Sequence, residues 1–446
     1  EQGQFGHSVA IDGDFLVVGA WMDDASGVNS GRAYVYDLAG SSPDEPLLAL
    51  ENPSPAENDN FGVSVAISSS KVAVSAYHDN TGNPNAGRVY IYDLEGQIPA
   101  VPVLSLGKPG ADRNDCFGSA LSMSGPLLAV GSELSDADAL NSGNVYVFNL
   151  DSGTPGQPVH SLANPVPQDH GYFGTSVSIS GTFLTVGAYR NDGAVVNGGA
   201  CYVFDLAGST PTVPLLSLSK PSWDEDDSLG NSVAMAGNKI LAGAWRDDTG
   251  ELDSGISYVY DLDAEIPASP VMVLDSPRRD SVDRFGTAVA IAGDLVAVGS
   301  PDSDSGSTRA GRVSIHDLAS SKPSATLAFL ENPNPAINDA FGSAVAISDT
   351  WIIVGAPGDD TGAANSGCVY VYDFSEGVPE SPMLVIPNPS PEAGEAFGAV
   401  IAASGSRIAV GVALDDTGAA DSGCVHLYVL RSPDPARPVA TVLDPD

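Results

Sequence analysis

The feature that most constrains this sequence is a dipeptide that recurs every fifty-six residues. Glycine follows a large apolar residue at eight evenly spaced positions: Phe5, Phe61, Phe117, Phe173, Leu229, Phe285, Phe341 and Phe397. No insertion interrupts the series, so eight copies of one unit fill the 446-residue chain. Since repeats of this length pack against their neighbours, residues 1–446 are predicted to form a single domain.

Each repeat contains four short segments with the composition of β-strands. In the first repeat, SVAI and FLVV flank a tight turn at Asp12-Gly13-Asp14, which is typical of a hairpin. The segment RAYVYDL alternates strictly, and PLLAL follows as a fourth strand that Pro46 introduces. Proline at this place indicates an edge strand, because it discourages pairing with another chain. Four antiparallel strands of this kind make one propeller blade.

Eight such repeats predict an all-β protein, an eight-bladed β-propeller of four-stranded antiparallel blades. The chain starts just before the first Phe-Gly and ends just after a fourth strand. We therefore expect the ring to close by packing of blade eight on blade one, with every blade intact. Phe-Gly and the Gly-Ala that ends the second strand fall at the same end of a blade. We interpret them as a structural clasp, with Phe as an apolar plug and Gly allowing close backbone approach.

Charge and cysteine content limit the possible functions. The chain has 57 acidic and 18 basic residues, a net charge of −39, which argues against nucleic-acid binding. This charge suits a cation-binding surface, a basic partner or simple solubility. No apolar run is long enough for direct membrane insertion. The four cysteines are expected to be free thiols, because Cys368 and Cys424 lie on the third strands of adjacent blades, too far apart for a disulfide.

Acidic residues gather in the loop between the second and third strands. Eight of them are candidate metal ligands: Asp23, Asp24, Asp247, Asp248, Asp359, Asp360, Asp415 and Asp416. Together with oxygens from the adjoining inter-blade links they could bind calcium, which takes only oxygen ligands. The other interpretation is that these side chains bond to their own backbone in turns.

Aromatic residues follow Gly-Ala on the same face of the disc. Four are candidate ligand-binding residues: Trp21, Tyr77, Tyr189 and Trp245. Aromatic side chains beside acids are typical of a sugar- or protein-binding surface, although each ring could instead pack over a neighbouring loop.

No pair of nucleophile and base stands at a recognisable spacing, so no catalytic residue is assigned. An enzyme would have to use scattered groups in the upper loops of blade four: His170, Tyr172, Tyr189 and Arg190. Such groups could abstract a proton from an acidic sugar.

At its Phe-Gly pairs and at Gly-Ala-Pro, residues 355–357, the chain resembles the FG-GAP repeat family, best known from the propeller of integrin α subunits. Its short hairpins and GDDTG loops are most similar to those of bacterial secreted members. Integrin-like repeats hold calcium in a D-x-D-x-D-G loop between the first two strands. The hairpins here are too short and carry at most two acids, such as Asp12 and Asp14, so that site is not carried over. The family usually has seven blades, whereas this chain has eight.

Together these features favour an extracellular or cell-surface binding or adhesion module, of bacterial origin, that presents an acidic loop face to a protein or a glycan. It would be a monomer or part of a larger surface protein. Two alternatives stay open: a polysaccharide lyase that uses the loops of blade four, and a purely structural spacer.

Overall fold

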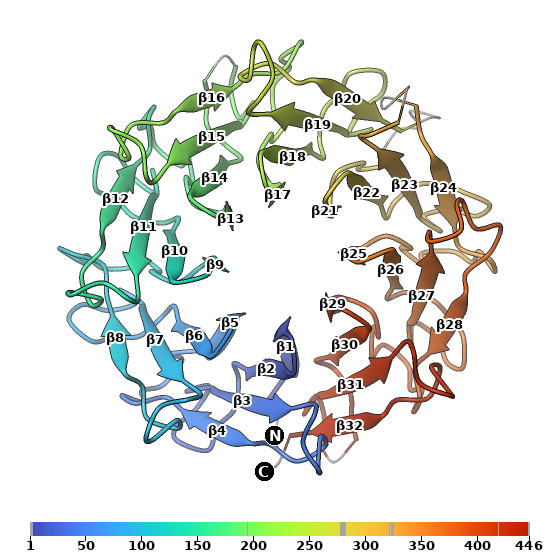
Figure 1. The fold of residues 1–446 in the computed structure, drawn as a ribbon, viewed down its shortest axis with the longest axis horizontal. Coiled ribbons are helices and arrows are strands. Elements are labelled where there is room, and N and C mark those ends of the chain that lie inside the picture. The colour runs from blue at the N-terminus through green and yellow to red at the C-terminus, as the bar shows by residue number, and fades with distance from the viewer. Residues whose placement is uncertain are drawn as a thin grey trace.

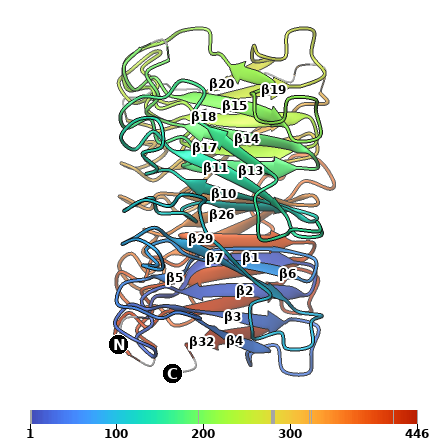
Figure 2. The same ribbon diagram turned by 90° about the vertical axis from the view of Figure 1, so that its left-hand side faces the viewer.

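The computed structural model describes residues 3–193, 195–276, 282–320, 322, 325–417 and 419–444. Within these residues the chain forms eight four-stranded antiparallel sheets arranged as a closed ring, and no helix (Figure 1). The eight-bladed, all-β propeller predicted from the repeat is therefore confirmed. Seen edge-on, the ring is a disc whose connections gather on its two faces (Figure 2).

The four strands of each blade run in chain order from the centre of the ring to its rim (Figure 1). The first strands are β1 (Phe5–Asp12), β5 (Phe61–Ser68), β9 (Leu121–Ser124), β13 (Ser176–Ser180), β17 (Ser232–Ala236), β21 (Val289–Ala292), β25 (Ala344–Ser348) and β29 (Val400–Ser404). The second strands are β2 (Phe15–Ala20), β6 (Lys71–Ala76), β10 (Leu127–Ser132), β14 (Phe183–Ala188), β18 (Lys239–Ala244), β22 (Leu295–Ser300), β26 (Trp351–Ala356) and β30 (Arg407–Val412). The third strands are β3 (Arg32–Asp37), β7 (Arg88–Asp93), β11 (Asn144–Asn149), β15 (Ala200–Asp205), β19 (Ile256–Asp261), β23 (Arg312–Asp317), β27 (Cys368–Asp373) and β31 (Cys424–Val429). The fourth strands are β4 (Leu48–Glu51), β8 (Leu104–Leu106), β12 (His160–Ala163), β16 (Leu216–Leu218), β20 (Met272–Asp275), β24 (Ala328–Glu331), β28 (Leu384–Pro387) and β32 (Ala440–Leu443).

The hydrophobic core lies between blades, on the second and third strands. Leu16 and Val17 point to opposite faces of β2, and both are completely buried. Leu16 packs in the cluster shared with blade eight, and Val17 in the cluster shared with blade two. These strands are therefore apolar on both faces, because a neighbouring blade covers each face.

The Phe-Gly pair and the Gly-Ala pair form two halves of one inter-blade contact. Phe61 is buried between blades one and two, and its backbone N–H donates to the carbonyl of Ser30 at 3.0 Å. A Cβ on Gly19 would lie only 1.9 Å from the carbonyl oxygen of Gly62, which itself has a φ of 94°. Two glycines thus allow the backbones of adjacent blades to touch, while the phenylalanine fills the space beside them.

Ring closure uses the same contact. The backbone N–H of Phe5 donates to the carbonyl of Ser422 at 2.9 Å, and Phe5 shares a core cluster with Val425 and Val442. Blade eight therefore packs on blade one without exchange of a strand, as predicted, and the two ends of the chain lie close together (Figure 1).

All four cysteines are free and buried. They are Cys116, Cys201, Cys368 and Cys424. The described residues contain no helix that is long and apolar enough to cross a membrane.

Candidate functional site

We call the face that carries the loops between second and third strands, together with the inter-blade links, the loop face. On it, between blades four and five, lies a cavity of about 540 Å³. Tyr189 and Arg190 line it from the residues just after β14, and Trp245 and Arg246 line it from the residues just after β18. Because the repeat places both pairs at the same position of neighbouring blades, the four side chains converge.

Guanidinium groups lie over the aromatic rings of this cavity. Arg190 lies 5.4 Å from the ring centroid of Tyr189, and Arg246 lies 4.5 Å from that of Trp245. The guanidinium of Arg284 also lies over Trp245, at 5.0 Å. The indole N–H of Trp245 is buried and has no hydrogen-bond partner within the described structure. The cavity therefore presents the residue types, Trp, Tyr and Arg, that dominate binding energy at protein interfaces.

The other two candidate aromatics lie apart from this cavity. Trp21 packs against His7, with ring centroids 5.2 Å apart, and its indole N–H donates to Oε1 of Gln4 at 2.8 Å. Tyr77 stacks on His78 at 3.9 Å. The structure thus brings together Tyr189 and Trp245, whereas the other two rings pack on nearby side chains.

Some of the groups considered for catalysis lie close together in the structure. Tyr172 stacks on Tyr189 with ring centroids 5.5 Å apart, and its hydroxyl lies 3.3 Å from Nδ1 of His170. The lining of the cavity, however, includes Tyr189 and Arg190 and not His170. Burial raises the pKa of Tyr189, so its phenol stays protonated at neutral pH and the phenolate needed to abstract a proton is not populated.

The paired loop acids form turns. The buried Asp359 accepts a hydrogen bond from the backbone N–H of Thr361 at 2.9 Å, and the exposed Asp360 accepts one from Asn365 at 2.8 Å. The same two contacts recur at the other pairs, Asp23 and Asp24, Asp247 and Asp248, and Asp415 and Asp416. Turn formation therefore engages one oxygen of each candidate metal ligand, and calcium binding by the remaining oxygens stays a prediction.

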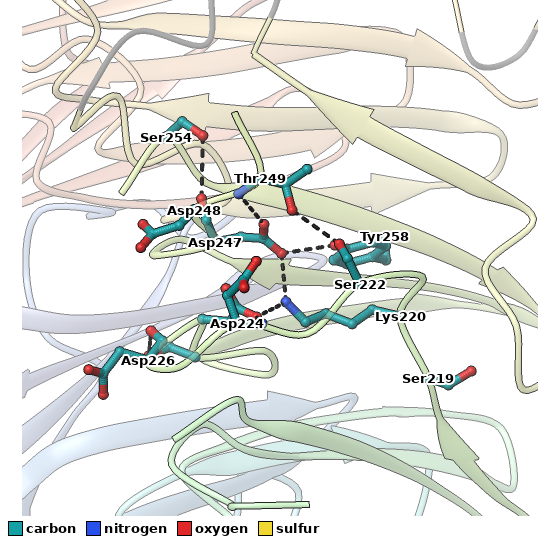
Figure 3. Close-up of polar contacts among 12 residues, drawn as sticks. Ser219, Lys220, Ser222, Asp224, Asp226, Asp247, Asp248, Thr249, Ser254 and Tyr258 are labelled. Carbon is teal, nitrogen blue, oxygen red and sulfur yellow. Dashed lines mark hydrogen bonds and ion pairs between the residues drawn. The ribbon is translucent and has the colours of Figure 1, made fainter. Parts of the chain in front are cut away.

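Beneath the loops of blade five lies a buried ionic cluster (Figure 3). Lys220, in the link from blade four, forms ion pairs with Asp227 and, at 2.7 Å, with Asp247. The hydroxyl of Tyr258 on β19 donates to the same oxygen of Asp247 at 2.9 Å. These three charged side chains are completely inaccessible to solvent.

The two carboxyl groups of this cluster respond differently to their surroundings. Burial, opposed by the hydrogen bond from Lys220, raises the pKa of Asp227 to about 6. Burial also acts on Asp247, but the attraction and hydrogen bond of Lys220 outweigh it and hold the pKa below its ordinary value. One ammonium group thus keeps one carboxylate ionised and compensates the other only in part.

Blade seven has the same arrangement with an amide in place of the ammonium group. Asn332 donates to Asp339 at 2.7 Å and to Asp359 at 3.2 Å, while Tyr370 donates to Asp359 at 2.6 Å. Burial raises the pKa of Asp339 to about 6. The second oxygen of Asp339 is buried and has no hydrogen-bond partner in the part of the chain that is described.

Sequence reasoning missed the position that supplies Lys220 and Asn332. It lies nine residues before the second to the eighth of the Phe-Gly and Leu-Gly pairs and is occupied there by Asn52, Lys108, Asn164, Lys220, Ser276, Asn332 and Asn388. Asp444 holds the same repeat position in the last copy. Each of these residues precedes a proline, and this recurring polar-Pro pair was a signal that could have identified the position. Of the two arginines in the cavity, the sequence singled out Arg190 only as a group for the enzyme alternative, and Arg246 was missed because arginine recurs at this position in only two repeats.

Comparison with known proteins agrees with this fold. The structure resembles the crystal structure of Saccharomyces cerevisiae Sqt1 with a TM-score of 0.57, over 100% of this chain and 97% of that one. The sequences are 10% identical, so the likeness concerns the fold alone. No curated protein matches the sequence. The FG-GAP repeat matches at residues 1–36, 52–92, 108–148, 163–204, 223–260, 279–316 and 330–372. Because these matches cover more than half of the chain, the protein belongs to the FG-GAP repeat family.

Proposed function

We propose that this protein is an extracellular or cell-surface binding module that holds a protein partner on its loop face. The observation that carries the proposal is the cavity between blades four and five, where Tyr189, Arg190, Trp245 and Arg246 converge. Propellers built from FG-GAP repeats are in general binding or structural modules, which supports this reading.

The charge distribution favours a basic partner. The cavity is lined by two arginines and by the acids Glu133 and Asp226, so its own formal charge is balanced. The chain as a whole has a net charge of −39. A basic protein would be attracted by the whole surface and would place an aromatic or amphipathic side chain among Tyr189 and Trp245. Its association rate should fall as salt is added.

Calcium is the cofactor that we propose for the loop face. Asp339, Asp359, Asn332 and Tyr370 in blade seven offer only oxygen and amide groups, and one buried oxygen of Asp339 lacks a partner. Such an oxygen-rich set fits a hard cation, which would neutralise two buried carboxylates. Calcium would then order the loops that carry the binding face.

The proposal can be tested with arrays of defined probes at several calcium concentrations. We expect synthetic peptides rich in lysine and aromatic residues to bind the wild-type protein. The double variant R190A/W245A should bind them at least tenfold more weakly. Arg437→Ala, an exposed arginine outside the cavity, and Tyr77→Ala are the matched controls, and neither should change binding more than twofold.

Other results would support the alternatives. Binding of acidic or neutral oligosaccharides that depends on Trp245 would indicate a glycan-binding module. Conversion of such oligosaccharides to unsaturated products would indicate a lyase. If no peptide or glycan binds in a manner that depends on the cavity, the chain is better described as a structural spacer.

A further inference from the structure

Blade eight has a histidine at a buried position where six of the other blades have a tyrosine. His426 on β31 stands where Tyr34, Tyr90, Tyr258 and Tyr370 donate a hydroxyl to the buried loop aspartate. Its Nε2 lies 3.2 Å from Sγ of Cys424, and that sulfur lies 3.2 Å from Oδ2 of Asp415. The three ligand atoms all lie within 4.8 Å of one another. Carboxylate, thiol and imidazole therefore face a common point.

The site is buried, and no basic side chain among the described residues forms a salt bridge with its carboxylate. Asp415 and Cys424 have no solvent exposure, and His426 has 1%. Within the described residues Asp415 has no salt bridge of the kind that Lys220 makes to Asp247 in blade five. Glu395, a second buried acid, lies in the adjoining link and interacts electrostatically with Cys424. A buried anionic site of this kind gains from a bound cation.

The neighbouring blade provides an internal comparison. Cys368 occupies the strand position of Cys424, but its Sγ lies 3.2 Å from the carbonyl of Ile386. The residue two places further on is Tyr370, which bonds to Asp359. With a tyrosine at this position, blade seven offers a single nitrogen or sulfur ligand, the thiol of Cys368. In blade eight, His426 adds an imidazole nitrogen to the thiol of Cys424. The single change from Tyr to His thus creates a mixed ligand set.

The donor types select the kind of metal. Sulfur, nitrogen and oxygen donors together suit zinc and related transition ions rather than calcium or magnesium. With metal–ligand bonds of about 2.0–2.3 Å, tetrahedral zinc separates its ligand atoms by about 3.3–3.6 Å, close to the two distances of 3.2 Å. Nδ1 of His426 lies 2.9 Å from Oγ1 of Thr441, a contact that fixes the ring and leaves Nε2 directed at the site.

We propose that Asp415, Cys424 and His426 bind one zinc-type divalent ion that stabilises blade eight. Binding replaces the proton of the Cys424 thiol with a metal–sulfur bond and releases that proton to solvent, while the imidazole and the carboxylate contribute lone pairs. Three protein ligands leave one position for a water molecule. Because the site is buried, the ion enters as the protein folds.

A metal-free arrangement would also satisfy these groups, and the experiment must separate the two. Thr441 could donate to Nδ1, Nε2 could donate to Sγ, and the thiol could donate to Asp415. The full chain is unfolded, refolded under reducing conditions with zinc or Co²⁺, and freed of loosely held metal by brief chelation. Metal content is measured by mass spectrometry, and the cobalt form by its absorption spectrum.

We expect about one retained ion per chain and a thiolate-to-cobalt charge-transfer band in the wild-type protein. Cys424→Ala and His426→Tyr should retain at least tenfold less metal and lose the band. The variant H426Y carries the residue that six of the other seven blades have at this position, which favours folding. Cys368→Ala is the matched control and should behave as wild type.

A wild-type protein that folds but shows no charge-transfer band would overturn the proposal, as would equal metal retention by C424A. Carboxylates elsewhere on the acidic surface could bind cobalt, but they cannot produce a thiolate band. The wild-type spectrum therefore decides the question even if a variant fails to fold.

Discussion

Blades five and seven each bury two carboxyl groups, but a different side chain lies between these groups in each blade. In both, an acid from the inter-blade link and an acid from the loop after the second strand are buried together beneath a strand tyrosine. In blade five, Lys220 lies between them as a cation. In blade seven, Asn332 takes the same position and contributes only amide hydrogens.

This difference shows that the repeat conserves the place of the buried carboxylates but not the group that compensates them. The lysine holds the pKa of the loop acid Asp247 below its ordinary value. The acid from the link has a pKa raised to about 6 in both clusters, as Asp227 beside the lysine and as Asp339 beside the asparagine. The residue nine places before the next Phe-Gly thus decides whether a buried cation attracts these carboxylates, while burial raises the pKa of the link acid in either case.

Removal of the lysine should have the largest effect. Lys220→Met leaves Asp227 and Asp247 buried without a cation, and loss of one partner of a buried ion pair costs about 3–5 kcal/mol. Lys71→Met, which removes a partly exposed pair with Asp93, should cost about 0–1 kcal/mol. Urea unfolding at neutral pH measures both. Equal losses for the two variants would show that the blade-five cluster is not a buried ionic one.

Replacement of a single acid by its amide should have opposite effects on the free energy of unfolding at the link acid of blade seven and at the loop acid of blade five. Asp339→Asn imitates the protonated acid and should stabilise the protein by about 1–3 kcal/mol at pH 7. Asp247→Asn removes the charge that Lys220 binds and should destabilise it by about 1–3 kcal/mol.

The pH dependence of the effect of D339N tests whether the raised pKa of Asp339 causes the stabilisation. The pKa of Asp339 is about 6 when folded, against an ordinary value of 3.8, so the folded state binds more protons between these values. The contribution of Asp339 to stability is therefore complete below about pH 4 and is lost as the pH rises through about 6. The advantage of D339N over wild type should vanish near pH 4. A constant difference between pH 4 and 7 would contradict this explanation.

Transfer of the lysine should weaken that stabilisation. Asn332→Lys gives blade seven the residue that blade five uses, and its ammonium group should attract the carboxylate of Asp339 as Lys220 attracts that of Asp227. On this background D339N should stabilise less, and the coupling between the two substitutions should be about 1 kcal/mol. A double-mutant cycle by urea unfolding measures the coupling. Additive effects would mean that residue 332 does not control the charge of Asp339.

Calcium should have the smallest effect. Free calcium equal to its Kd would stabilise the native state by about 0.4 kcal/mol, since only the folded chain binds it. The melting temperature should rise more in calcium chloride than in sodium chloride of equal ionic strength. The double variant D360A/D416A should blunt that gain. If the two salts act alike, the loop aspartates form turns only.

Much of the fold could be predicted from the repeat, whereas the candidate site could be predicted only in part. Tyr189 and Trp245 stood out because they share a repeat position with other aromatics. Arg246 and Arg284 did not, because an isolated arginine in a loop carries no pattern. The next residue in the chain decides whether a ring is paired with a guanidinium, as Trp245 is with Arg246, or packs on a histidine, as Tyr77 does on His78. Only the folded structure places Arg284, which comes from another segment, over Trp245.

The amino-acid order of one repeat was enough to specify a blade, and the number of copies specified the ring. A single four-stranded sheet with two apolar faces cannot be stable alone, so the repeats had to stack and close. The contacts between neighbouring blades, in contrast, form only in the folded ring. Lys220 and Asp247 belong to different repeats and meet only because links and loops converge on one face. Burial then decides whether a proton, an ammonium group or a metal ion balances their charge, since that balance depends on distance from water rather than on residue order.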